Sequence, residues 1–439
     1  MKIRSRAALA ARLLLFPVLV LSACRHEESD AYYWLEEIDG ERALEWVRAQ
    51  NASTAERLQA YSEFDSFYAE ARAALDSASR IPEVEQRGEY LYNLWRDEEH
   101  PRGLYRRTTL DELRQEQPHW QTVLDIDALS AADGEKWVFK RMHCLPDEYR
   151  HCLLFLSPGG GDATVVREFD MESLAFVAGG FELPVAKNQV DWLDADTLFV
   201  GTDFGAGSMT ESGYPRIVKL WRRGTSLAEA RTLYEGSPSS VGAGGERYHM
   251  DAGDIDLVSE GLTFWRSVRY QLAGDELQEL ELPETATVED GYRGKLVVSL
   301  KEDWNLGDRT LHRGSVVIAA PESLWAGAER AIEVLVEPTA EAVVEDVDAT
   351  RDAILVTMLD NVRGRLYRYR PAADGTWQRD AISFPDNGSL LVATTDSGSG
   401  SFFVEYESFT TPPTLYHVGG PDWLPERIKA QDATFDSSR

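Results

Sequence analysis

The chain has 439 residues, of which 43% are hydrophobic and 10% aromatic, so it can bury a sizeable core and is not a disordered chain. It carries 45 basic and 75 acidic residues, which gives a formal net charge of −30. A surface of this charge repels phosphate backbones, so nucleic acid is not an expected partner. The acidic charge keeps the protein soluble or, in a more specific alternative, attracts cationic peptides.

The first residues are typical of a bacterial lipoprotein signal peptide. A basic stretch (Lys2, Arg4, Arg6 and Arg12) precedes the apolar run 13–21, which is shorter than the roughly 20 residues that span a bilayer. The run ends in Leu21-Ser22-Ala23-Cys24, which resembles a lipobox, where the cysteine is lipidated and becomes the new N-terminus. We therefore predict a signal peptide over residues 1–23 and lipidation of Cys24. The alternative is an ordinary secretory signal with an incidental cysteine.

The residues after this cysteine indicate a location. Residues 24–31 are polar and are predicted to be a short tether to the lipid anchor, because several acyl chains hold a protein stably on a membrane. We expect the protein in the bacterial cell envelope, on the periplasmic side of a membrane. Arg25, in place of an aspartate after the cysteine, favours the outer membrane.

Residues 32–79 are predicted to be helical. Leu44, Trp46 and Val47 cluster on a first helix, and Asn51, Ser53 and Thr54 offer a break and an N-cap. Apolar residues then recur at the three- and four-residue spacing of an amphipathic helix: Leu58, Tyr61, Phe64, Tyr68, Ala71 and Leu75. The apolar face of this helix needs a packing partner.

From residue 80 to about 425 the pattern changes to short apolar runs separated by clusters of Gly, Asp, Asn and Pro. The predicted strands are 89–95, 137–143, 153–156, 196–201, 217–221, 262–266, 295–300, 315–319, 353–358, 366–369, 390–393 and 401–406. So many strands without long helices predict an all-β fold: a propeller, a sandwich array or a β-solenoid. Seven blades of about 49 residues each would fit the usual size of a propeller blade.

Two further cysteines, Cys144 and Cys152, flank a turn-like segment between two apolar runs. A hairpin would place them opposite each other, and an envelope location permits a disulfide. Such a short closed loop would stabilise the fold by about 2–3 kcal/mol. Two free thiols are the alternative.

Several motifs, in order along the chain, resemble the prolyl oligopeptidase family of serine peptidases. They are Tyr33–Glu37 with Ala43–Val47 and Gln50-Asn51, Tyr90–Asp97 with Gly103–Thr108, Arg167–Asp170 with Ser212–Arg216, and Tyr406–Tyr416. The resemblance covers residues 32 to about 436. It implies a seven-bladed β-propeller over 80–425, preceded by the helical segment 32–79, which would pack on an α/β-hydrolase domain. Residues 426–439 would begin the return to that domain, which we expect to be absent from this chain.

The resemblance implies catalysis by a serine in a Gly-x-Ser-x-Gly elbow, a histidine base and an aspartate. No pair of glycines at this spacing encloses a serine, and the nearest look-alike, Gly207-Ser208, is typical of a polar loop. We therefore assign no catalytic residue to this chain.

The chain also carries no motif for a cofactor or a metal, and we predict neither. Its eight histidines lack metal-like spacing, and Gly159–Asp162 lacks the Lys-Ser/Thr of a phosphate loop. His143 and His151 flank Cys144 and Cys152, so these four side chains could in principle hold zinc. Ordinary positions on the surface of a hairpin are the simpler interpretation.

These features predict the non-catalytic part of a prolyl-oligopeptidase-like endopeptidase. Its propeller would act as a steric gate that admits short peptides to the active site, and the chain alone would be inactive. The expected partners are short peptide substrates and, through the lipid anchor, a membrane. The alternative is a stand-alone propeller lipoprotein that binds a peptide or a protein, with residues 32–79 packed on the propeller itself.

Overall fold

The computed structural model describes residues 30–75, 81–146, 148–433 and 436. The chain divides into two units, Met1–Asp76 and Ser77–Arg439. The predicted signal peptide, Cys24 and most of the tether lie outside the described residues, so lipidation and location stay predictions. No helix in the described part of the chain has both the length and the apolar character that a membrane crossing requires.

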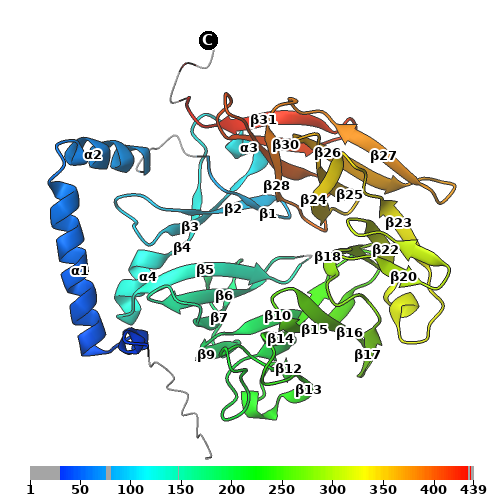
Figure 1. Cartoon of the computed structure of the whole chain (residues 1–439), viewed down its shortest axis with the longest axis horizontal. Coiled ribbons are helices and arrows are strands. Elements are labelled where there is room, and N and C mark those ends of the chain that lie inside the picture. The colour runs from blue at the N-terminus through cyan, green and yellow to red at the C-terminus, as the bar shows by residue number, and fades with distance from the viewer. Residues whose placement is uncertain (1–29, 76–80, 147, 434–435, 437–439) are drawn as a thin grey trace, which may run out of the picture. The chain divides into compact units, whose positions relative to one another are not determined.

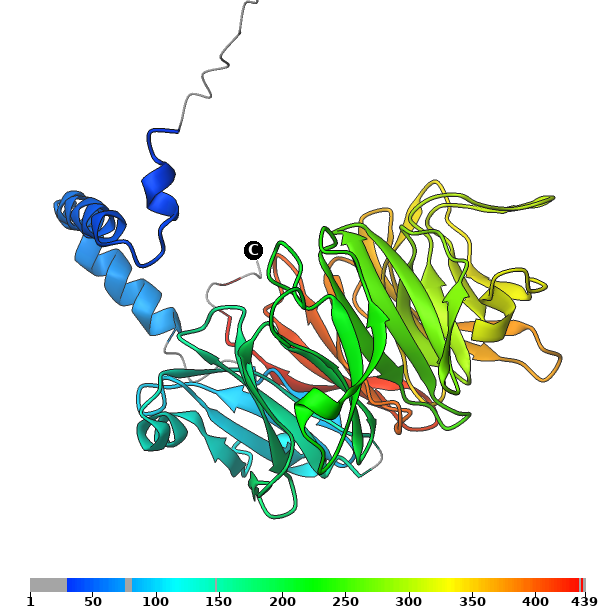
Figure 2. The same cartoon turned by 90° about the horizontal axis from the view of Figure 1, so that it is seen from below.

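The first unit consists of helices, as Figures 1 and 2 show: the 3₁₀ helix η1 (Tyr33–Glu36), α1 (Glu41–Gln59) and α2 (Phe64–Leu75). The break predicted at Asn51–Thr54 is wrong, because α1 runs through it and the helices separate at residues 60–63. These polar side chains are exposed, and each costs under about 1 kcal/mol in a solvated helix interior. The neighbouring Ala52, Ala55 and Glu56 favour the helix.

This helical unit has almost no core. Ala43 is its only buried residue among those whose burial the structure describes. Its large apolar side chains are exposed: Tyr32, Tyr33, Ile38, Leu44, Trp46, Val47, Leu58, Tyr61, Phe67, Tyr68 and Leu75. The apolar side chains predicted from the sequence are therefore not buried within this unit itself.

The second unit is a ring of seven antiparallel sheets, the blades, numbered here in chain order (Figure 1). Blades 1 to 3 are built from β1 (Glu85–Arg87), β2 (Tyr90–Trp95), β3 (Leu104–Thr109) and β4 (Gln121–Asp125); β5 (Trp137–Cys144), β6 (His151–Pro158), β7 (Thr164–Asp170) and β8 (Ala175–Phe176), with β9 (Glu182–Ala186) also on β7; and β10 (Gln189–Asp194), β11 (Thr197–Gly201), β12 (Ile217–Arg222) and β13 (Arg231–Glu235). Short helices α3 (Leu110–Leu113) and α4 (Ile126–Asp133) flank β4, and η2 (Leu227–Glu229) precedes β13.

Blades 4 and 5 contain β14 (Gly242–Tyr248), β15 (Ile255–Thr263), β16 (Arg266–Ala273) and β17 (Glu276–Leu280); then β18 (Thr287–Tyr292), β19 (Lys295–Ser299), β22 (Val316–Ala319) and β23 (Ile332–Val336). A hairpin of β20 (Trp304–Leu306) and β21 (Arg309–Leu311) is inserted in blade 5, and η3 (Pro321–Leu324) precedes β23. Blades 6 and 7 contain β24 (Ala342–Ala349), β25 (Ile354–Asp360), β26 (Arg363–Pro371) and β27 (Trp377–Ile382); then β28 (Ser389–Thr394), β29 (Phe402–Glu407), β30 (Thr414–Gly419) and β31 (Leu424–Ala430).

The predicted fold class is confirmed: an all-β, seven-bladed propeller preceded by a short helical segment. Every strand in the described residues belongs to a blade or to the β20–β21 hairpin, and none of them forms a hydrolase sheet. The second strand of each blade packs on both faces, so Leu153–Leu156 and Leu296–Val298 are buried without interruption. One predicted strand is wrong, because Leu262–Arg266 is the tip of the β15–β16 hairpin.

The ring closes between blade 7 and blade 1 without a shared strand, because each blade takes its own consecutive strands. An apolar cluster fills this seam: Val84, Leu91, Leu113, Phe403 and Leu415. Polar contacts flank it, since Arg114 donates from Nε and Nη2 to Glu426 at 3.0 and 2.8 Å. Side chains rather than a strand ladder therefore hold the first and last blades together.

Candidate functional site

Strand direction gives the propeller two distinct faces. The chain begins β1 and ends β31 on the same side, because each blade has an even number of antiparallel strands in its ladder. This side, named the proximal face, also carries the turns between second and third strands. The turns between first and second strands lie on the opposite side, named the distal face.

A cavity of about 540 Å³ lies at the distal face. It is lined by the turns between first and second strands of blades 4 to 7: His249–Ala252, Asp290–Arg293, Ala349–Asp352, Thr395 and Ser397. Arg293 and Arg351 bring two guanidinium groups to this rim, and Asp251 and Asp352 bring two carboxylates. The rim is therefore polar and of mixed charge.

A second cavity, of about 650 Å³, runs along the innermost strands β5, β10 and β14. Its lining includes Arg141, His143, Asp191 and Glu246, and it reaches Phe264 in the β15–β16 turn on the proximal face. The strand β14 begins Gly-Ala-Gly-Gly, and a Cβ at Gly245 would lie 2.4 Å from Cδ1 of Phe199. Glycine here lets blade 4 pack closely against blade 3.

Carboxylates on the innermost strands join neighbouring blades next to these cavities. Asp191 accepts a hydrogen bond from the backbone N–H of Arg247 at 3.0 Å, and Asp290 accepts one from Ala349 at 2.9 Å. Burial raises the pKa of Asp290 to about 6, although the backbone N–H groups of Gly291 and Ala349 both donate to this carboxylate. Burial, together with the nearby Asp346, Asp290 and Glu289 charges, raises the pKa of Asp348 to about 7.

Replacing Asp348 with asparagine is expected to stabilise the propeller above pH 7 and to have little effect near pH 4. The pKa of Asp348 is higher in the folded state than in the unfolded state, where it is near 4. Protonation of Asp348 therefore stabilises the fold fully below about pH 4, and this stabilisation is lost as the pH rises through about 7. The gain at pH 8 should be up to roughly 4 kcal/mol, because the pKa rises from near 4 to about 7 and each tenfold change in proton affinity corresponds to about 1.4 kcal/mol. Thermal unfolding of D348N and wild type between pH 4 and 8 checks this, with the exposed D275N as control. An equal difference at all pH values would contradict the expectation.

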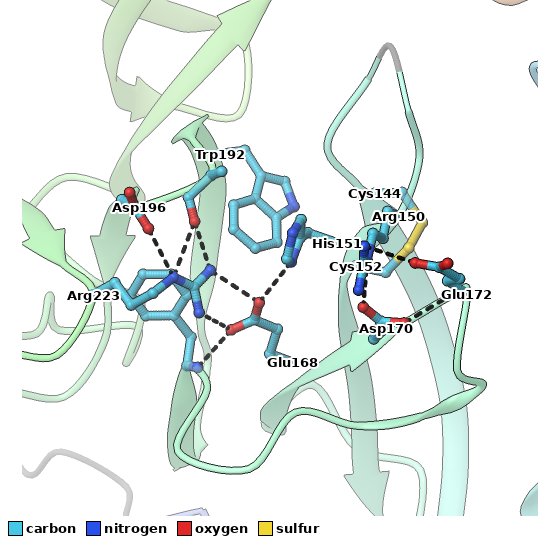
Figure 3. A network of polar contacts seen from close by, with 12 residues as sticks. Cys144, Arg150, His151, Cys152, Glu168, Asp170, Glu172, Trp192, Asp196 and Arg223 are labelled. Atoms are coloured by element: carbon cyan, nitrogen blue, oxygen red, sulfur yellow. Dashed lines mark hydrogen bonds and ion pairs between the residues drawn. A yellow bond between two sulfur atoms is a disulfide. The ribbon is translucent and has the colours of Figure 1, made fainter.

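Blades 2 and 3 are joined by a buried ion pair (Figure 3). Glu168 on β7 has a fully buried side chain and accepts two hydrogen bonds from Arg223, at 2.7 and 2.9 Å. It also accepts the N–H of Phe181 at 2.9 Å, and Nδ1 of His151 lies 3.1 Å away. Burial alone would raise the pKa of Glu168, but the donors from Arg223 and Phe181 outweigh it and lower the pKa.

Cys144 and Cys152 form a disulfide between directly opposed residues of β5 and β6 (Figure 3). The two histidines beside them contact different carboxylates: Nε2 of His143 lies 2.5 Å from Asp191, and His151 faces Glu168. These four side chains therefore do not gather around one point. The described residues contain no group of three or more His, Cys, Asp or Glu side chains suited to a metal.

Ser208, the nearest look-alike of a catalytic serine, is occupied by its own loop. Its hydroxyl donates to the carbonyl of Gly205 at 2.7 Å and accepts the N–H of Phe204 at 2.9 Å. Sequence reasoning missed the blade-joining carboxylates. A signal exists for Asp191 and Asp290, because each is an acidic residue within the first strand of its blade, close to apolar residues of that strand.

Comparison with known proteins decides the family. Residues 22–420 match the family described as prolyl oligopeptidase, N-terminal beta-propeller domain. The chain belongs to the prolyl oligopeptidase family. Within this family it is similar to the uncharacterized peptidase y4nA of Sinorhizobium fredii, with 33% identity over 94% of this chain and 58% of that protein. It is also similar to the uncharacterized peptidase RP174 of Rickettsia prowazekii, with 25% identity over 87% of this chain and 55% of that protein.

Solved structures agree with this assignment. A post-proline cleaving enzyme from Rickettsia typhi superposes with a TM-score of 0.86 at 25% identity, covering 92% of this chain and 60% of that one. Oligopeptidase B from Trypanosoma brucei gives a TM-score of 0.71 at 16% identity, over 93% and 57% of the two chains, which shows a shared fold. The chain thus spans less than two thirds of the length of these relatives.

Proposed function

We propose that this chain is the non-catalytic portion of a prolyl-oligopeptidase-like serine endopeptidase and works as a steric gate with an α/β-hydrolase domain. The observation that carries the proposal is an apolar proximal face. Four large side chains in turns between second and third strands are 84–98% exposed: Phe264, Trp265, Val362 and Phe409. Val362 and Phe409 line one hollow on this face, and Phe264 and Trp265 are adjacent in the turn of another blade. Exposed large apolar side chains of this kind favour an interaction site, and this is the face from which the chain leaves the propeller.

The helical unit supports the same proposal. Its apolar side chains, which include Trp46 and Phe67, are not buried within the unit itself and are suited to a packing partner. The two cavities support the gating role, because openings lined by the innermost strands and by their turns would limit entry to narrow, flexible chains. In this proposal the substrates are short peptides, and the hydrolase domain supplies the serine, histidine and aspartate of catalysis.

The purified chain alone is expected to leave a proline-containing reporter peptide uncleaved and to resist labelling by a fluorophosphonate, because its sequence has no Gly-x-Ser-x-Gly elbow to present an activated serine. A fusion that continues the chain into the hydrolase region of the Sinorhizobium relative should cleave the reporter. It should also cleave a short peptide but spare the same sequence inside a folded protein. Inhibitor-sensitive cleavage by the chain alone would refute the proposal, and equal cleavage of the folded substrate would refute the gate.

A further inference from the structure

The disulfide of blade 2 lies at the base of a hairpin that reaches two other blades. Cys144 and Cys152 are the last directly opposed pair of the β5–β6 ladder, so the bond closes the ladder at the distal face. Tyr149, inside the closed loop, has a left-handed backbone with φ of 49°. A non-glycine residue holds this conformation only where its surroundings fix it.

The fixing contact of Tyr149 is on blade 7. Its hydroxyl donates to Oδ1 of Asp396 at 2.7 Å, and Asp396 is only 4% exposed. The other oxygen of Asp396 accepts the N–H of Gly88, on blade 1, at 2.6 Å. One buried carboxylate therefore joins blades 1, 2 and 7. We name Tyr149, Gly88 and Asp396 the latch.

The backbone conformation of Gly88 suits this arrangement. Its φ of 58° is in the left-handed region, and a Cβ there would lie 3.6 Å from Cδ2 of Tyr149, so the tyrosine ring lies over the β1–β2 turn. Arg87 completes the junction, since it donates to the phenol oxygen of Tyr105 at 2.8 Å and to Sγ of Cys144 at 3.3 Å. The disulfide itself is thus part of the contact between blades 1 and 2.

The latch crosses the seam where the ring closes without a shared strand. Asp396 stands between Thr395 and Ser397, two residues that line the distal cavity. On the far side of the hairpin, Arg150 donates to Asp170 at 2.7 Å and holds the hairpin base on blade 2 (Figure 3). The hairpin therefore has one end fixed on its own blade and the other on blade 7.

We propose that the Cys144–Cys152 disulfide puts the latch, and with it the closure of the blade 1–blade 7 seam at the distal face, under redox control. Oxidised, it holds Tyr149 against Asp396. A dithiol reductant supplies two electrons and two protons, converts the disulfide into two thiols and itself becomes a disulfide, which frees the hairpin and loosens the seam. The effect of reduction on peptide passage rests on the proposed function, whereas the opening of the seam is independent of that function.

Hydrogen exchange measured by mass spectrometry on the purified chain tests the latch without any peptidase activity. In dithiothreitol, residues 84–92 and 394–399 should exchange at least about fivefold faster, whereas β15 and β19 should stay protected. Tyr149→Phe, with its disulfide intact by mass, should show fast exchange at the seam before reduction. The paired substitution Cys144→Ser with Cys152→Ser should show it in both conditions.

Tyr234→Phe is the matched control. Tyr234 donates to the carboxylate of Glu260 between blades 3 and 4, so its loss removes the same kind of bond elsewhere and should leave the seam unchanged. Equal exchange at the seam in oxidised and reduced chain overturns the proposal. So does wild-type exchange in oxidised Tyr149→Phe, or the presence of free thiols at Cys144 and Cys152 after expression in an oxidising compartment. If the double cysteine variant does not fold, hydrogen exchange at the seam of the wild-type chain, measured at increasing dithiothreitol concentrations, still tests the proposal.

Discussion

Replacing Arg223 with alanine is expected to lower the free energy of unfolding by about 3–5 kcal/mol. The reason is the carboxylate that remains. Glu168 has no exposed side-chain surface, and Arg223 supplies two of its hydrogen bonds. Without the guanidinium, only Phe181 and His151 remain to compensate a buried charge, which is costly in a low-dielectric interior. The thermal midpoint should fall by roughly 4–7 °C, because the unfolding entropy of so large a unit is high.

Three variants separate this effect from the loss of an ordinary ion pair. Arg231 pairs with Asp275 at 3.1 Å, but the Asp275 side chain is 92% exposed, so Arg231→Ala should cost under about 1 kcal/mol. Glu168→Gln combined with Arg223→Ala removes the buried charge and should recover part of the loss. Denaturant unfolding of the single and double variants measures these differences. A cost for Arg223→Ala no larger than that for Arg231→Ala would show that the buried pair contributes little.

The sequence predicts the fold best at the second strands of the blades, because several of these strands are nearly continuous apolar runs. The second strands pack on both faces, so they appear as apolar runs such as Leu153–Leu156 and Val297–Val298. The first and last strands of the blades have no such signal. The outer strand β27 is largely exposed, and the innermost strand β14 begins with glycines that close packing requires. The apolar run Leu262–Arg266 misled for a physical reason: Phe264 and Trp265 are exposed at a turn.

The helical unit shows a similar limit. Its three- and four-residue periodicity predicted helices correctly, because that spacing is a local property of the chain. The break near Thr54 was wrong because a solvated helix tolerates isolated polar residues, and only the turn at 60–63 separates α1 from α2.

The candidate site was mostly beyond sequence reasoning, because its contacts join residues far apart in the chain. Tyr149 and Asp396 are 247 positions apart, and Glu168 and Arg223 are 55 apart. No periodicity relates such positions. The disulfide partners, by contrast, are eight positions apart and flank a turn, so their pairing could be considered from the sequence.

Replacing Phe403 with alanine is expected to destabilise the propeller by about 3–5 kcal/mol and to loosen the ring at one place. Phe403 is 1% exposed in the cluster that closes the blade 1–blade 7 seam, together with Leu91, Leu113 and Leu415. No strand ladder spans this seam, so a cavity there removes much of what joins the two blades. Hydrogen exchange should accelerate in β1, β2 and β31.

Phe402→Ala provides a control of the same size on the same strand. Phe402 is fully buried but points to the opposite side of β29, where it packs in a cluster with Leu355, Leu366 and Leu390 of blades 6 and 7. Its loss should cost a similar free energy while accelerating exchange at the junction of blades 6 and 7, because adjacent residues of a strand face opposite sides of the sheet. If both variants loosen the same blades, the seam between the first and last blades is not a separate point of weakness, and the ring opens as one cooperative unit.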